Sequence, residues 1–409
     1  MRSVADFYRD CLNHVDQQDP LDVLLEGAVG CVLAENVEAP FDVPVTDVAG
    51  CDGYAVRVTD FEAAATVGAG SVSVHLMVTD EIKAGDVQPA VLIERAAVRI
   101  ASGAPIPRGA DAVVPLEFTD LGVAEVEVRM IPRVGENIRR RAEDVQAGQV
   151  VLEEGTRLSA RQIGLLAGVG RSRVVVRPRP RVVVLSIGSE LIEPGVTARP
   201  GTVFDSNGYA LSAAVADAGA ETYRVAAVPD ERNRLANTIA DQLVRADLIL
   251  TTGGISYGSG DTVREVLGGL GTVRFDSVAA WPGHIMGIGT VGEGIPIFCL
   301  PGDPVAAQVC FEVYVRPSLR KMQGWVSLNR QTMLATVDRS WFSPPGLRQF
   351  VRVRVTGNPR EGYRAAVMGE PGALWLSAMA NSNALAVVSE EVTEVQEGEV
   401  LTCMVLEES

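Results

Sequence analysis

The chain has few of the residues that build disulfide frameworks or zinc sites. Its six cysteines are scattered, no two of them closer than 11 residues, and no CxxC pair occurs. Only three histidines are present among 409 residues, too few and too far apart for a histidine-based metal site. We therefore expect buried, reduced thiols and no zinc centre.

The chain also lacks any tract of basic residues. Its formal net charge is −16, and a negative surface opposes binding to nucleic acid or to an anionic membrane. No uninterrupted apolar run reaches about 18 residues, the length that a membrane-spanning helix requires. The first residues lack the apolar core of a signal peptide. We therefore predict a cytoplasmic protein that neither binds nucleic acid nor inserts into a membrane.

The apolar pattern changes several times along the chain, which predicts several domains rather than one core. Residues 3–16 and 21–34 have the periodicity of amphipathic helices. Residues 51–134 alternate in short strands instead. The predicted domains are a mixed linker domain (21–50 and 135–180), a β-rich insert domain (51–134), an α/β domain (1–20 and 181–328) and a small C-terminal β-barrel (329–409).

Strands and helices alternate most clearly between residues 182 and 322. This alternation predicts an α/β fold with a doubly wound, mostly parallel sheet, to which the β-rich insert and the C-terminal β-barrel are added. Ligands in such sheets bind at the carboxyl ends of the strands. One predicted strand, 248–252, ends at Gly253-Gly254, and another, 295–300, ends at Pro301-Gly302. The sequence therefore predicts two ligand-facing turns in one domain.

Both turns are suited to contact a ligand through the backbone. Gly253 and Gly254 place no side chain in the way, and the hydroxyls of Thr252 and Ser256 stand beside them. Asp303 is predicted to cap the helix that follows the second turn, and free N–H groups at a helix start can hold phosphate. Strand closure and ordinary helix capping are the alternative explanations of these residues.

Acidic residues also stand in turns rather than in charged surface runs. They are Asp52, Asp144, Glu190, Asp230 and Asp261. Each alone is typical of a cap or a turn. Several together would suit a hard cation such as Mg²⁺, which prefers oxygen ligands. The sequence leaves open whether they converge.

Seven motifs, in order, resemble the MoeA family of molybdopterin molybdenumtransferases and the E domain of gephyrin. They are Asp-Gly-Tyr-Ala at 52–55, Ser-Gly-Ala-Pro at 102–105, Gly-Glu-Asn-Ile at 135–138, Gly-Ser-Glu-Leu at 188–191, Asp-Ser-Asn at 205–207, Thr-Gly-Gly-Ile-Ser at 252–256 and Leu-Pro-Gly at 300–302. The resemblance covers almost the whole chain. It implies four subdomains, a homodimer, and an α/β domain that binds the pterin-phosphate part of molybdopterin.

The family inserts molybdate into adenylyl-molybdopterin and releases AMP, a step of molybdenum cofactor biosynthesis. The resemblance implies catalytic roles for Asp52, Ser102, Asp144, Glu190, Asp230 and Asp261, the last three of them also as Mg²⁺ ligands. The positions that it implies for molybdopterin binding are Asn207, Thr252, Gly253, Gly254, Ser256, His284, Pro301, Gly302 and Asp303. Molybdopterin, its adenylylated form and molybdate are the implied substrates.

The chain departs from the family pattern at the anion site. Trp281 and His284 stand where the family usually has lysines, and Asp303 stands where it has asparagine. A charge-assisted contact to phosphate contributes about 1.5–3 kcal/mol, so these changes predict weaker anion binding.

An alternative function follows from the same resemblance. Some members of the family, gephyrin among them, are dimeric scaffolds that hold a short linear peptide of a partner protein. The partner is a membrane receptor or, in bacterial members, the tail of the cell-division protein FtsZ. Phe7 and Tyr8 are the residues predicted to bind such a peptide.

Overall fold

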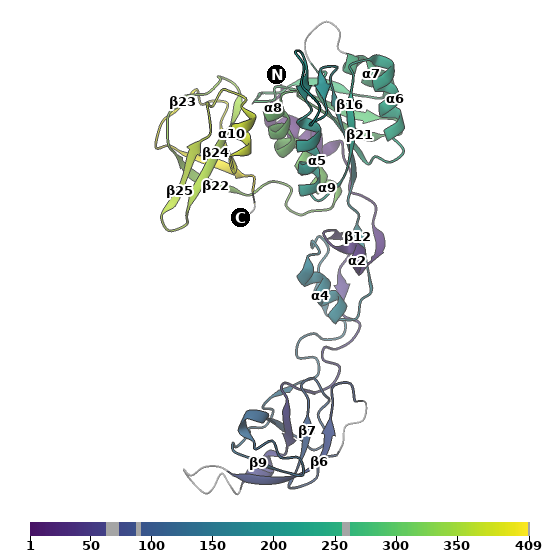
Figure 1. Ribbon diagram of the computed structural model, residues 1–409, viewed down its shortest axis with the longest axis vertical. Coiled ribbons are helices and arrows are strands. Elements are labelled where there is room, and N and C mark those ends of the chain that lie inside the picture. Colours follow the sequence, from purple (N-terminus) through teal and green to yellow (C-terminus); the bar gives the residue numbers. More distant parts are fainter. Residues whose placement is uncertain (63–72, 87–90, 256–261, 408–409) are drawn as a thin grey trace.

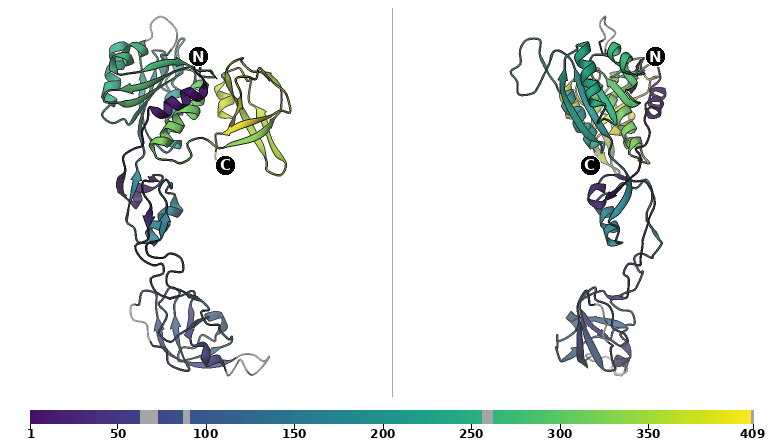
Figure 2. Two further views of the ribbon diagram at one scale, coloured as in Figure 1. Left: turned by 180° about the vertical axis from the view of Figure 1, so that it is seen from behind. Right: turned by 90° about the vertical axis from the view of Figure 1, so that its right-hand side faces the viewer.

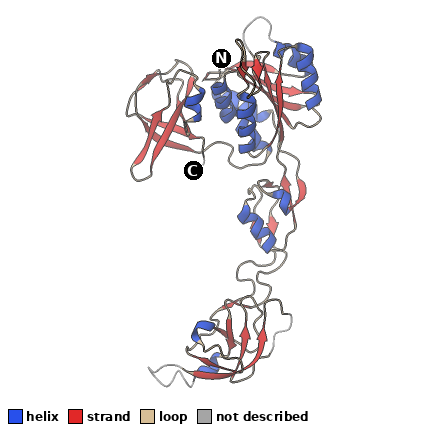
Figure 3. Ribbon diagram, in the orientation of Figure 1, coloured by secondary structure: helices blue, strands red, loops and turns tan. Residues whose placement is uncertain are grey.

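The computed structural model describes residues 1–62, 73–86, 91–255 and 262–407, and the chain forms an elongated molecule with four parts (Figure 1). A β-rich insert domain forms one end, and a small middle domain connects it to the α/β domain. The C-terminal barrel lies beside the α/β domain at the other end, as the views from behind and from the side also show (Figure 2). Most of the helix belongs to the α/β domain (Figure 3). Within the described ranges, no helix is long and apolar enough to cross a membrane.

The insert domain is built on one five-stranded sheet with the order β8-β5-β7-β6-β9. Its elements are β5 (Gly53–Val56), η1 (Val58–Phe61), β6 (Val74–Ile82), β7 (Ala96–Ile100), β8 (Ala112–Pro115), η2 (Leu116–Phe118) and β9 (Glu125–Val128). Alternate residues of the central strands bury two apolar clusters, with Ala55 and Val98 in one and Tyr54 and Ala97 in the other. The sheet is therefore covered on both faces.

The middle domain is assembled from two separate stretches of the chain. Its elements are β1 (Leu21–Leu24), α2 (Leu25–Ala28), β2 (Val32–Leu33), β3 (Val37–Glu38), β4 (Val48–Ala49), β10 (Ile138–Arg139), β11 (Val150–Leu152), α4 (Ala160–Gly168) and β12 (Arg173–Arg177). The helix predicted over 21–34 is wrong, because β1 pairs antiparallel with β12 and leaves only a four-residue helix. Helical and strand periodicities are hard to distinguish in short apolar runs.

The α/β domain contains a six-stranded sheet with the order β16-β13-β17-β21-β20-β18. Its elements are α1 (Val4–Asn13), β13 (Arg181–Ile187), β14 (Leu191–Ile192), β15 (Val203–Phe204), α5 (Asn207–Asp217), β16 (Glu221–Val228), α6 (Arg232–Gln242), β17 (Leu248–Thr252), α7 (Thr262–Leu270), β18 (Arg274–Ser277), β19 (Ala280–Trp281), β20 (Ile285–Val291), β21 (Ile295–Leu300), α8 (Pro304–Cys310), the π-helical turn η3 (Phe311–Val315) and α9 (Arg316–Met322). The first four strands of the sheet are parallel, and β20 runs antiparallel to both of its neighbours, β21 and β18. The predicted doubly wound, mostly parallel sheet is confirmed.

Both faces of this sheet are buried, which explains why its strands are almost continuously apolar. Val182 and Val184 of β13 pack in one core together with Phe7, Leu211 and Phe311. Val183 and Leu185 point to the opposite face and pack with residues of α6 and α7. The helices thus form two layers that enclose the sheet.

The C-terminal domain is a closed five-stranded barrel in which β24 pairs with both β25 and β26. Its elements are β22 (Thr332–Val337), β23 (Trp341–Phe342), β24 (Arg348–Asn358), β25 (Gly362–Val367), α10 (Leu376–Ala380), β26 (Ala384–Val388), β27 (Glu394–Val395) and β28 (Val400–Val405). The prediction of a C-terminal β-barrel is confirmed. Trp281 of β19 pairs with Gln349 of β24, so a short strand of the α/β domain extends the barrel sheet.

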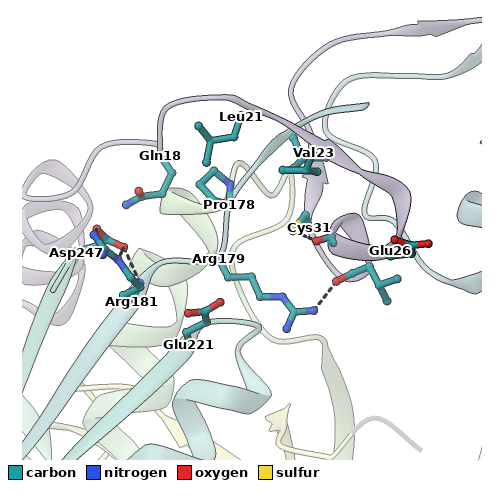
Figure 4. Close-up of a pocket in the computed structure, with 13 residues that line it drawn as sticks. Gln18, Leu21, Val23, Glu26, Cys31, Pro178, Arg179, Arg181, Glu221 and Asp247 are labelled. Atoms are coloured by element: carbon teal, nitrogen blue, oxygen red, sulfur yellow. Dashed lines mark hydrogen bonds and ion pairs between the residues drawn. The ribbon is translucent and has the colours of Figure 1, made fainter. Parts of the chain in front are cut away.

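A cavity of about 550 Å³ lies where the middle domain meets the α/β domain (Figure 4). On one side of it, Arg181 forms an ion pair with Asp247, with an Nη2–Oδ1 distance of 2.8 Å. Arg179 reaches across and donates to the carbonyl oxygen of Val29. None of the predicted site residues lines this cavity.

Candidate ligand site at the sheet switch point

The strand order of the α/β sheet reverses between β13 and β17. After β13 the chain crosses to β16 on one side, and after β16 it crosses back to β17 on the other. The loops after β13 and β17 therefore diverge and leave a crevice at their carboxyl ends, where ligands of such sheets bind. A cavity of about 220 Å³ lies there. Its lining includes Ser186, Glu190, Asp205, Asn207, Thr252, Gly253, Gly254 and Gly302.

The glycines of this crevice are required by its geometry. Gly253 and Gly254 both adopt positive φ angles, +87° and +67°. A Cβ atom on Gly253 would lie 2.3 Å from the carbonyl oxygen of Ile187, and one on Gly254 would lie 2.3 Å from Cγ2 of Val263. The two ligand-facing turns also approach closely, because a Cβ on Gly302 would lie 3.3 Å from Cα of Gly253. Any side chain here would separate the turns.

Asn207 connects the two turns through its side-chain amide. Its Nδ2 donates to Oγ1 of Thr252 at 2.9 Å and to the carbonyl oxygen of Gly302 at 2.8 Å. Thr252 in turn donates to the carbonyl oxygen of Pro301 at 2.7 Å. Asn207 is 8% exposed, and its Oδ1 has no hydrogen-bond partner among the described residues. A buried acceptor without a donor in a ligand cavity suits an N–H or O–H group of a bound molecule.

Asp205 fixes the start of α5 and was missed as a site residue. It is buried, and its Oδ1 accepts hydrogen bonds from Ser186 Oγ at 2.7 Å and from the backbone N–H of Gly208 at 2.8 Å. Ser206 stands at the N-cap position of this helix but makes no capping hydrogen bond. Asp205 takes that role because its carboxylate satisfies one of the free N–H groups of the first turn.

Arg224 of β16 links Asp205 to the outer wall of the crevice. Its guanidinium makes two 3.0 Å hydrogen bonds to Glu193, lies 3.4 Å from Asp205 Oδ2, and stacks 4.1 Å above the ring of Tyr209. The hydrogen bonds from Arg224, and a further one from Tyr209, hold the pKa of Glu193 below its ordinary value. This network fixes the loop that carries Glu190.

The predicted metal ligands Glu190 and Asp230 lie on neighbouring turns. The backbone N–H of Asp230 donates to Ser189 Oγ at 3.1 Å, and Glu190 lines the crevice. Both side chains are exposed. Asp261, the third predicted metal ligand, and Ser256, predicted to bind molybdopterin, lie outside the described residues. In the described ranges, no three acidic, histidine or cysteine side chains form a group able to hold a metal.

A second cavity of about 180 Å³ adjoins the first across Gly302 and Pro301. Trp281, His284, Asp303 and Leu374 are among the residues that line it. The rings of Trp281 and His284 are stacked, with 6.4 Å between centroids and 20° between planes. Predicted molybdopterin-binding residues thus line two adjoining cavities, which meet at the Pro301-Gly302 turn.

Asp303 caps α8, the helix that follows the second ligand-facing turn. Its Oδ1 accepts hydrogen bonds from the N–H groups of Val305 and Ala306, each at 2.9 Å. The capping prediction is confirmed. Of the two explanations left open by the sequence, phosphate binding and ordinary capping, the structure favours capping for these two N–H groups, because the aspartate already occupies them.

Arg352 is a buried cation that the sequence analysis missed. It lies on β24 with no exposed surface, donates to the carbonyl oxygens of Glu370 and Ala373, and leaves Nε and Nη1 without partners in the described structure. Burial lowers the pKa of its guanidinium, and the negative charge of Asp303 acts in the opposite direction. The positive charge of Arg352 therefore acts electrostatically on Asp303, which lines the cavity from which the family's lysines are absent.

The remaining predicted catalytic residues lie in other domains of the chain. The backbone N–H of Ser102 donates to Asp52 Oδ1 at 2.7 Å, so these two residues are brought together on the insert domain. Asp144 is in the middle domain, where its backbone N–H donates a hydrogen bond to the carbonyl oxygen of Val43. All three side chains are exposed. The insert domain is at the far end of the molecule from the switch-point cavity (Figure 1), so one chain does not unite the predicted site.

The two aromatic residues predicted for peptide binding differ in exposure. Phe7 has no exposed surface, and its ring packs edge-on against Tyr314 at a centroid distance of 5.1 Å. Tyr8 is half-buried, and its hydroxyl donates to Asn329 Oδ1 at 2.9 Å. Of the two, Tyr8 is the residue that a partner can reach in this conformation.

The fold and the site define a multi-domain protein whose α/β domain has a small cavity at its switch point, the place where α/β sheets of this kind bind ligands. Comparison with known families gives three matches in chain order. Residues 2–170 match the MoeA N-terminal region (domain I and II), 183–321 match a probable molybdopterin binding domain, and 335–406 match the MoeA C-terminal region (domain IV).

Individual relatives agree with these matches. The chain is 39% identical to molybdopterin molybdenumtransferase 2 of Mycobacterium tuberculosis, with 97% of this chain and 98% of the relative covered. It is 37% identical to molybdopterin molybdenumtransferase 1 of the same organism, with 93% of each covered. A crystal structure of a molybdopterin biosynthesis MoeA protein from Pyrococcus horikoshii superimposes with a TM-score of 0.80 at 27% identity, covering 100% of this chain and 99% of that one. The chain belongs to the MoeA family.

Proposed function

We propose that this protein inserts molybdate into adenylyl-molybdopterin with release of AMP. Its relatives are molybdopterin molybdenumtransferases, and their names support a role in molybdenum cofactor biosynthesis. The observation that carries the proposal is the switch-point cavity, in which the buried Asn207 joins both ligand-facing turns and leaves its Oδ1 free. A pterin, with N–H donors on its ring edge, provides the group that this oxygen needs.

In this proposal the backbone turns bind the substrate and exclude water. Gly253, Gly254 and Gly302 let the phosphate approach the main chain without a side chain between them. Glu190 and Asp230 present oxygen donors of the kind that Mg²⁺ prefers, and two carboxylates are enough when water and a substrate phosphate complete the shell. Bound there, Mg²⁺ would neutralise charge on the phosphate that leaves with AMP.

The missing lysines of the anion site have a partial replacement in this chain. Arg352 brings a buried guanidinium to Asp303 from the barrel side. A guanidinium presents several N–H donors in a fixed plane, which matches an oxyanion. We propose that Arg352 offsets the charge of Asp303 and helps to hold the oxyanion substrate near Trp281.

We further propose that the active form is a homodimer in which each site takes residues from both copies. Asp52 and Ser102 form a pair on the insert domain, and Glu190 and Asn207 belong to the switch-point cavity. The length of the molecule separates these two groups within one chain (Figure 2). A second copy arranged head to tail would bring one chain's insert domain to the other chain's α/β domain.

The direct test is AMP release by the purified chain. Adenylyl-molybdopterin is mixed with molybdate and Mg²⁺, and AMP is measured by chromatography against a reaction without molybdate. We expect molybdate-dependent AMP release and transfer of molybdenum to the pterin. If neither is observed while the chain remains folded, the proposal is wrong.

A peptide-binding scaffold is the second candidate, and Tyr8 is the residue that favours it. Tyr8 is half-exposed on α1 beside Asn329, on the connection between the α/β domain and the barrel. The predicted partners are the FtsZ tail and membrane-receptor peptides. Fluorescence anisotropy with a labelled FtsZ-tail peptide is expected to show binding that Tyr8→Ala weakens. Equal binding by Tyr8→Ala, or none by the wild type, would reject this candidate.

A further inference from the structure

A separate cavity of about 510 Å³ lies where three domains meet. The middle domain contributes Arg157, and the barrel's end contributes Leu406 and Glu407. The α/β domain and the connection that follows it contribute Asp217, Ala218, Gly219, Arg316, Arg320, Trp325 and Arg330. None of the residues predicted for catalysis, molybdopterin binding or peptide binding lines it. Four arginines from three segments of the chain therefore line the same cavity.

Two of the arginines that line this cavity are deeply buried, whereas Arg157, Asp217 and Glu407 are exposed. Arg316 is 2% exposed and the side chain of Arg330 is 6% exposed, whereas the side chain of Asp217 is 71% exposed. Behind the cavity, the buried Glu312 accepts hydrogen bonds from Arg330 and forms an ion pair with Arg316. With Glu312, Asp217 and Glu407 counted, the described arginines still exceed the carboxylates by one.

Arg157 and Trp325 bring further donors to this cavity. The guanidinium of Arg157 lies 5.3 Å from the centre of the Trp325 ring, and no carboxylate of the described residues is within ion-pair distance of it. The Trp325 Nε1–H is buried and has no acceptor among those residues. A buried donor without an acceptor costs about 1–3 kcal/mol, so an anion that accepts from both groups would be favoured.

We propose that this cavity binds a phosphate group, either inorganic phosphate or the phosphate of a monoester. Phosphate is the ligand that this chemistry fits, because its oxygens accept from several guanidinium groups at once, with the paired geometry that arginine provides. A bound phosphate would also connect the middle domain, through Arg157, to the α/β domain, through Trp325 and Arg330. The ligand would therefore stabilise one arrangement of the three domains.

Isothermal titration calorimetry on the full chain, in buffer free of phosphate and sulfate, tests the proposal. The probes are inorganic phosphate and glycerol 3-phosphate. We expect saturable binding of at least one probe and a change in tryptophan fluorescence that Trp325→Phe abolishes. Arg157→Gln is expected to weaken binding about tenfold, because it removes one charge-assisted contact.

The matched control is Arg161→Gln. Arg161 lies in α4 of the same domain, and its side chain is exposed outside the cavity, so the variant should bind as the wild type does. Binding of phosphate alone identifies the free ion as the ligand, and tighter binding of glycerol 3-phosphate identifies an ester. The proposal is overturned if neither probe binds at about 10 mM, or if Arg157→Gln and the wild type bind equally.

Discussion

Asn207 Nδ2 lies 2.9 Å from Thr252 Oγ1, so a helix start and a strand end on opposite sides of the switch point are joined by one side chain. The same nitrogen donates to Gly302 at 2.8 Å. One amide therefore sets the width of the crevice, and its remaining oxygen is available to a ligand. This contact depends on the strand order, which brings residues 45 and 95 positions apart to one place.

Asn207→Ala is expected to weaken molybdopterin binding about tenfold or more, because both hydrogen bonds between the turns and the free acceptor are lost. Binding is measured by calorimetry. The free energy of unfolding should fall by about 1–3 kcal/mol, since the buried acceptor groups of Thr252 and Gly302 lose a donor. Asn233→Ala, on the exposed side of α6, is the control. Unchanged affinity in Asn207→Ala would contradict this role.

Gly253→Ala is expected to destabilise the chain by about 2 kcal/mol or more, because a Cβ would lie 2.3 Å from the Ile187 carbonyl oxygen at a φ of +87°. Gly268→Ala is expected to stabilise the chain instead. Gly268 lies within α7 with nothing near the added carbon, and alanine in a helix is favoured by about 0.5–1 kcal/mol. Urea unfolding of the two variants measures the difference. If both shift stability in the same direction, the steric argument fails.

Arg352→Met is expected to lower affinity for the oxyanion substrate about tenfold or more, because the negative charge of Asp303 is then no longer offset by this cation. The effect should appear in KM more than in kcat. Arg352→Lys should recover part of the affinity, because lysine restores the positive charge but not the planar set of N–H donors of a guanidinium. Arg354→Met, two positions on and exposed, is the control. An unchanged KM in Arg352→Met would remove this residue from the site.

Co-expression of Asp52→Asn and Glu190→Gln chains tests the composite site. Each variant alone should be inactive. Mixed dimers should recover about one quarter of the wild-type activity, because half of the dimers are mixed and each has one intact site. AMP release is the readout. No recovery, with mixed dimers shown to form, would indicate that both residues act within one chain.

The Glu193–Arg224 contact predicts a pH-dependent loop. Hydrogen bonds from Arg224 and then from Tyr209 lower the pKa of Glu193, so this contact stabilises the fold above the ordinary glutamate pKa of about 4.3. That stability is lost as the pH falls through the lowered value. The protection of backbone amides of residues 188–206 from hydrogen exchange should decrease over that acidic range in the wild type. In Glu193→Gln this protection should not depend on pH over the same range. Equal pH dependence in both would contradict the assignment.

Much of the fold was determined by local sequence patterns. The strands at 248–252 and 295–300 and the helix after Asp303 lie where the apolar runs and the Asp-Pro start predicted them. The helix predicted over 21–34 is wrong, because the first part of this segment pairs as a strand with β12, some 150 residues later. Single-sequence periodicity contains no information about such a partner.

The candidate site shows the same division between local and tertiary information. Glycine spacing by itself located both ligand-facing turns, since positive φ angles and close backbone approach demand glycine. The sequence also determined the family through its ordered motifs. Only the tertiary structure revealed Arg352 as a site residue. In the sequence it is one residue of an alternating barrel strand, with no motif around it. Phe350, on the same face of that strand, packs into the α/β core, whereas Val351 and Val353 fill the barrel. The positive charge that acts on Asp303 is therefore decided by how two domains pack, an electrostatic interaction between residues 49 positions apart that no local pattern encodes.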